Sequence, residues 1–186
     1  MSELDERNLV NELENQIRDI QPCSLRDPGS GRHQSLDSAG TDLWNLCTKL
    51  FRQNQEAETM SPMRTKLIVL ARTFSFYVVA LARDGDNIEP GAMRLLAKLA
   101  IKASRYCIGE SRNMWFHLPS RTAADPPSET QELKFAQLLL QSAMDYKTRM
   151  EEPSHALPED ELQECTKLES ECQILRMVWV GHTIVY

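Results

Sequence analysis

The sequence is poor both in residues that break helices and in residues that favour strands. Only seven glycines and nine prolines occur among 186 residues, which excludes collagen-like and low-complexity chains. Valine and isoleucine total 15, whereas leucine, alanine and methionine total 45, a balance that favours helix over sheet. No pair of alternating segments predicts a β-hairpin. The composition therefore predicts an all-α chain, long enough for one substantial core.

Motifs of catalysis and of metal binding are also absent. There is no P-loop, no G-x-G-x-x-G, no G-x-S-x-G and no H-E-x-x-H. Acid pairs such as Glu151-Glu152 stand beside prolines at predicted helix ends, where they suit a helix terminus. The histidines all fall in predicted loops or in the tail: His33, His117, His155 and His182. We therefore expect no catalytic residue, no metal site, no cofactor and no enzyme.

The cysteines number five, without any C-x-x-C pair, and the chain has no glycosylation sequon. They are Cys23, Cys47, Cys107, Cys165 and Cys172. All but Cys23 fall on apolar helix faces, which favours buried small side chains. The acidic N-terminus lacks the apolar run of a signal peptide, so we expect a reducing compartment, cytosol or nucleus. A small helical enzyme that uses a buried cysteine stays open as an alternative, because catalytic partners need not be sequence neighbours.

One run, residues 67–82, is apolar enough to raise the question of whether it spans a membrane. Arg72, Thr73 and Ser75 interrupt it. It is also shorter than the roughly 20 residues that span a bilayer. We expect a core helix buried on most sides, and no membrane segment.

Six segments have helical periodicity, with expected starts near residues 3, 37, 61, 89, 128 and 159. This spacing predicts antiparallel helical hairpins, as in an α-solenoid of the tetratricopeptide type, and a compact six-helix bundle fits nearly as well. The expected organisation is an N-terminal helix (1–20), a flexible loop (21–35), a helical-repeat region (36–177) with a long loop at 109–127, and an atypical tail (178–186).

Each expected helix carries one apolar stripe that should face the core. The stripes are Leu9, Leu13, Ile17 and Ile20; Leu43, Cys47 and Leu50; Met63, Leu67, Leu70, Phe74, Val78 and Leu81; Met93, Leu96, Ala100, Ala103 and Cys107; Phe135, Leu139, Ala143, Tyr146 and Met150; and Leu162, Cys165, Leu168, Cys172, Leu175 and Trp179. Replacing Leu70 or Phe74 by alanine should then cost about 2–5 kcal/mol of stability.

The net charge of −6 conceals a segregation of charge along the chain. Residues 1–20 and 151–171 are acidic, and residues 64–121 are basic. The acidic balance argues against direct nucleic-acid binding. Within the basic part, one helix face carries the residues that we predict to contact a protein partner or a neighbouring acidic segment: Arg94, Lys98, Lys102 and Arg105. Trp44 with Asn45 is a second candidate surface, although a Trp there usually packs between helices.

The segment from Leu36 to Leu50 (LDSAGTDLWNLCTKL) resembles a known family. A leucine-aspartate-x-x-glycine-threonine-x-leucine-tryptophan-asparagine segment comes early in the meiosis- and sporulation-specific tetratricopeptide scaffolds, the fungal "zip-four" proteins and their testis-expressed animal relatives. The apolar helix at 66–76 and the runs at 103–107 and 171–177 also look similar. The resemblance covers roughly residues 36–110 and 160–177.

The resemblance implies a non-catalytic nuclear scaffold on meiotic chromosomes. Its partners would be other proteins, namely chromosome-axis, synapsis or crossover factors, which it would link during synaptonemal complex assembly and meiotic recombination. Family members are several times longer, so the resemblance implies an N-terminal portion, truncated after the atypical tail. A generic helical adaptor of cytosol or nucleus is the alternative.

Overall fold

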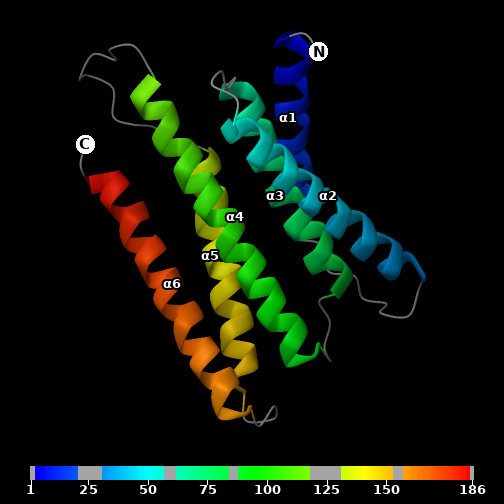
Figure 1. The fold of residues 1–186 in the computed structure, drawn as a ribbon, viewed down its shortest axis with the longest axis vertical. Coiled ribbons are helices and arrows are strands. Elements are labelled where there is room, and N and C mark those ends of the chain that lie inside the picture. The colour runs from blue at the N-terminus through cyan, green and yellow to red at the C-terminus, as the bar shows by residue number, and fades with distance from the viewer. Residues whose placement is uncertain are drawn as a thin grey trace. The chain divides into compact units, whose positions relative to one another are not determined.

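The computed structural model describes residues 3–20, 31–56, 62–83, 88–117, 131–152 and 157–184. Within these ranges the chain forms six α-helices and no strand, which confirms the all-α fold class (Figure 1). The helices are α1 (Glu3–Ile20), α2 (Gly31–Glu56), α3 (Pro62–Arg83), α4 (Pro90–His117), α5 (Gln131–Met150) and α6 (Glu159–Ile184).

The helices group into two compact units, Met1–Ile88 and Glu89–Tyr186. The first unit holds α1, α2 and α3, and the second holds α4, α5 and α6. The boundary falls inside the stretch 36–177, which the sequence predicts to be one helical-repeat region. Each unit has its own buried apolar side chains.

In the first unit, both α1 and α2 pack on α3, which is therefore buried on most sides. Leu70 and Phe76 are the largest of its fully buried side chains. Among the described residues, α3 is also the one helix long and apolar enough to cross a membrane, but 67% of its most apolar stretch is buried inside the structure. The expected burial of this helix is confirmed.

The contact between α2 and α3 is close because of Gly40. A Cβ atom at this position would lie 2.7 Å from Val79 Cγ2 and 3.2 Å from the Val79 backbone nitrogen. The Ser75 hydroxyl donates a hydrogen bond of 2.6 Å to the Gly40 carbonyl. About one helical turn away along the same contact, Arg83 binds both carboxylate oxygens of Asp37. Gly40 therefore sets the distance between the two helices and does not break α2.

In the second unit, α4 packs most extensively on α5, and α6 packs on both of them. Pro90 and Pro158 stand at the starts of α4 and α6, and the carbonyls of Glu89 and Pro158 accept the first hydrogen bonds of these helices. The predicted core faces of α4 and α5 are all buried: Met93, Leu96, Ala100, Ala103, Cys107, Phe135, Leu139, Ala143, Tyr146 and Met150.

Several expected boundaries differ from the structure. Residues 31–35 of the expected loop 21–35 already belong to α2, and residues 109–117 of the expected loop 109–127 belong to α4. The tail at 178–186 continues α6 as far as Ile184. A glycine costs only about 1 kcal/mol in a helix and a β-branched residue less, so these residues do not stop the helices from extending through the segments. Residue 128, near which the fifth helix is expected to start, lies outside the described residues.

Some predicted core positions are also wrong. Leu9, Leu50 and Leu162 are exposed, and Val10 and Gly40 are buried in the faces that α1 and α2 turn to α3. In α3, Phe74 is only half-buried, whereas Phe76 is fully buried. Because α3 contacts both α1 and α2, it buries residues outside any single stripe.

Candidate interaction surface

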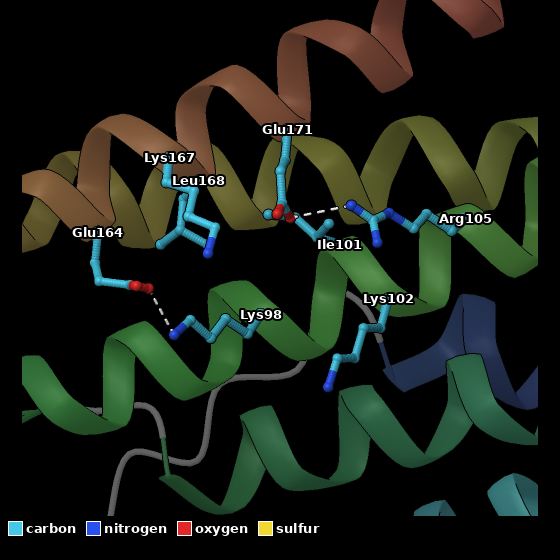
Figure 2. A pocket seen from close by; sticks show the side chains of 8 residues that line it. All are labelled: Lys98, Ile101, Lys102, Arg105, Glu164, Lys167, Leu168 and Glu171. Atoms are coloured by element: carbon cyan, nitrogen blue, oxygen red, sulfur yellow. Dashed lines mark ion pairs between the residues drawn. The ribbon is translucent and has the colours of Figure 1, made fainter.

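The four predicted interaction residues lie along one helix, α4, and three of them form ion pairs with glutamates of α6. Arg94 lies 3.5 Å from Glu161. Lys98 lies 2.7 Å from Glu164, and Arg105 lies 3.2 Å from Glu171 (Figure 2). Lys102 is exposed and forms no ion pair with any residue that the structure describes.

The acidic segment 151–171 thus supplies the partners of the basic helix face. The sequence left open whether this face contacts another protein or a neighbouring acidic segment. In the structure, three of its four cations form ion pairs with the neighbouring acidic segment. The glutamates were not predicted as site residues. Their spacing follows that of the cations along a parallel helix, and this match, together with the opposite charge, was the signal that could have found them.

α6 is held on α5 as well. Lys147 lies 3.0 Å from Glu169 and 2.8 Å from Glu151, and Arg176 donates a hydrogen bond of 3.3 Å to Gln141. The hydrogen bond to Glu151, with that to Glu169, raises the pKa of Lys147 above its ordinary value, although burial opposes this.

The buried side of α6 is narrow. Among its described side chains, the buried apolar ones are Cys165, Leu168 and Cys172, two of which are small. Because little apolar surface is covered, we expect the register of α6 on its neighbours to depend on the row of ion pairs. An exposed ion pair contributes little stability alone, whereas an aligned row specifies how two helices lie together.

An acidic pH should weaken the contact between α4 and α6. The hydrogen bond from Lys98, with its positive charge, lowers the pKa of Glu164 below the ordinary value of 4.5. A carboxyl whose pKa is lower in the folded chain stabilises the fold above its unfolded pKa, and this contribution is lost as the pH falls through the folded pKa. We expect Glu164→Gln to destabilise the chain at pH 7, and the difference from wild type to shrink below pH 4.5.

Urea unfolding of both chains across this pH range measures the effect. Glu152→Gln, at an exposed position outside the helix contacts, is the matched control and should follow the wild-type profile. A Glu164→Gln difference that is the same at acid and neutral pH would contradict the ion pair.

The Trp44-Asn45 pair lies in α2 of the first unit. Trp44 is buried, and the Arg72 guanidinium stacks over its ring at 4.3 Å from the centroid. Arg72 donates a hydrogen bond of 3.0 Å to Thr48 Oγ1, and the Thr48 hydroxyl donates one of 2.9 Å to the Trp44 carbonyl. Trp44 thus packs between α2 and α3 and forms a cation–π contact with Arg72 of α3. Asn45 is exposed beside it.

Four of the five cysteines are described; all four are buried, and none of them forms a disulfide with another described cysteine. Burial raises the pKa of the Cys47 thiol to about 11, although the nearby Arg72 charge lowers it. Burial also raises the pKa of Cys165 and of Cys172. An activated cysteine nucleophile needs a lowered pKa, so these three thiols are shifted in the opposite direction.

Native alkylation is therefore expected to be slow at these cysteines. With iodoacetamide near neutral pH, Cys47, Cys165 and Cys172 should stay unlabelled in the folded chain, because so little thiolate forms. The same reaction in guanidinium chloride should label all five cysteines. Mass spectrometry locates the labels, and one fast-reacting buried thiol in the folded chain would revive the cysteine-enzyme alternative.

No group of three or more His, Cys, Asp and Glu side chains is arranged to hold a metal ion within the described ranges. The expected loop positions of the histidines differ from the structure. His33 lies in α2, where its Nδ1 is 3.3 Å from the Ala82 carbonyl oxygen, and His117 and His182 lie within α4 and α6. His155 lies outside the described residues.

No protein-family model, curated protein or solved structure matches this chain. A functional assignment therefore depends on the chain's own sequence and on the contacts within each of its two units.

Proposed function

We propose that this protein is a non-catalytic interaction scaffold that acts in the nucleus, on chromosomes, during meiotic synapsis and crossover recombination. The proposal is based mainly on where the segment 36–50, which resembles the meiotic scaffold family, lies in the fold. It lies in α2, and its Gly40, Trp44 and Cys47 form the buried face packed on α3. The residues that resemble the meiotic tetratricopeptide scaffolds are thus those that join one helix to the next, as a helical-repeat scaffold requires.

Apolar side chains on the outer sides of the helices support a role in protein contacts. Ile174 and Met177 of α6 are 54% and 66% exposed, and Leu46 of α2 is 51% exposed. Ile174, Met177 and Val178 share one side of α6, away from its buried Cys165 and Cys172. Clustered exposed apolar side chains mark contact surfaces for other proteins. The partners proposed are chromosome-axis, synapsis or crossover factors, with no direct contact to nucleic acid.

The test is localisation and co-purification of the tagged full chain in synchronised meiotic cells, with mitotic cells of the same strain as the control. The proposal predicts foci on chromosome spreads during prophase of meiosis, and enrichment of synapsis and crossover proteins in the meiotic sample alone. Equal expression and the same partners in mitotic cells would overturn the meiotic role and favour a generic helical adaptor.

A further inference from the structure

A small hollow lies between α4 and α6, with a volume of about 140 Å³. The buried side chains of Ile101 and Leu168 line it. The ion pairs Lys98–Glu164 and Arg105–Glu171 stand on either side of it (Figure 2). Apolar side chains thus line the hollow between two carboxylate–cation pairs.

The charges that line the hollow do not cancel. It is lined by the cations Lys98, Lys102, Arg105 and Lys167 and by the carboxylates Glu164 and Glu171. Both carboxylates already pair with cations of α4. Lys102 and Lys167 are exposed and form no ion pair with another residue in the described part of the chain. Figure 2 shows the Lys102 ammonium directed away from both glutamates.

We propose that this hollow binds an acidic side chain of a partner protein, with Lys102 and Lys167 as its cationic contacts. In the wall of the hollow, Lys98 and Arg105 of α4 already bind glutamate carboxylates at 2.7 and 3.2 Å, which shows that a cation on this helix face can bind a carboxylate carried on a peptide. Ile101 and Leu168 provide apolar contact for the methylene groups of an incoming glutamate. The inference rests on the proposed function and adds the chemistry of the partner, an acidic peptide segment.

A nucleic acid fits this hollow less well than an acidic peptide. Its affinity comes from successive phosphates, each of which needs a cation. Three of the cations on α4 are already bound by Glu161, Glu164 and Glu171, and these carboxylates would repel neighbouring phosphates. A single carboxylate carries one charge and so meets less of that repulsion than a row of phosphates, and Lys102 and Lys167 can offset it.

The test measures binding of fluorescein-labelled peptides to the full chain by anisotropy at low ionic strength. The probes are a glutamate–alanine peptide, the lysine–alanine peptide of the same length, and a single-stranded oligonucleotide. The variant Lys102→Gln/Lys167→Gln removes both unpaired cations, and Lys134→Gln, at an exposed lysine of α5, is the matched control. Circular dichroism checks that each variant keeps its helices.

The proposal predicts that the glutamate peptide binds wild type and Lys134→Gln within about twofold of each other, and the double variant at least about tenfold more weakly. Binding should weaken as salt is added. Equal affinity of wild type and the double variant, or tighter binding of the lysine peptide or of the oligonucleotide, would overturn it. The meiotic role fails separately, when the wild-type chain shows no meiotic localisation, whatever the peptide result.

Discussion

Replacing Phe76 by alanine should destabilise the Met1–Ile88 unit by about 3–5 kcal/mol. The side chain is 1% exposed and lies on α3, the helix that contacts both α1 and α2. Truncation would remove a ring from the centre of this unit, and the surrounding helices can fill the cavity only in part. Urea unfolding of the full chain, followed by circular dichroism, measures the loss.

Phe74→Ala is the matched control, since it removes the same side chain from the same helix two positions away. Phe74 is half-buried, so its loss should be clearly smaller than that of Phe76. The apolar stripe in the sequence predicts the reverse, because it includes Phe74 and omits Phe76. An equal or larger loss at Phe74 would mean that the stripe, and not the structure, describes the core of α3.

Gly40→Ala should destabilise the same unit by roughly 1–3 kcal/mol, although alanine is the better helix former. The new methyl group would lie 2.7 Å from Val79 Cγ2 and 3.2 Å from the Val79 backbone nitrogen. Neither atom can move easily, because the first belongs to a β-branched side chain and the second to a helix backbone. Thermal unfolding of wild type and variant measures the change.

Gly109→Ala should change the stability in the opposite direction from Gly40→Ala. Gly109 lies within α4, and no atom of the described residues outside its own helix backbone comes within 4 Å of a Cβ placed there. Alanine at this position should stabilise the Glu89–Tyr186 unit by up to about 1 kcal/mol, as expected for a helical glycine without a packing role. If Gly40→Ala and Gly109→Ala both stabilise the chain, the claim that α2 lies too close to α3 for a Cβ at position 40 is wrong.

The stripes predicted for α4 and α5 are correct but incomplete. Every residue predicted for them, from Met93 to Met150, is buried, and they omit other buried residues such as Ile101 and Leu140. The core of α3 could not be predicted in this way, because its contacts with α1 and α2 bury Phe76 and the polar Ser75 alike. Periodicity identifies one buried face of a helix and does not reveal a second neighbour.

The candidate surface was predictable in part. Charge and helical spacing located Arg94, Lys98, Lys102 and Arg105 on one side of α4. The sequence did not reveal that three of them contact α6, because pairing between distant helices depends on how the helices pack. The hollow beside Lys102 and Lys167 follows only from the packed structure, since it forms between two helices far apart in the chain.

Amide hydrogen exchange tests directly whether α6 pairs with the basic face of α4. The triple variant Arg94→Glu, Lys98→Glu and Arg105→Glu reverses the face, and adding Glu161→Lys, Glu164→Lys and Glu171→Lys reverses its partners. We predict that the triple variant loses protection of the α6 amides and that the sixfold variant regains it. Unchanged α6 protection in the triple variant, or no recovery in the sixfold variant, would contradict the pairing of these two helices.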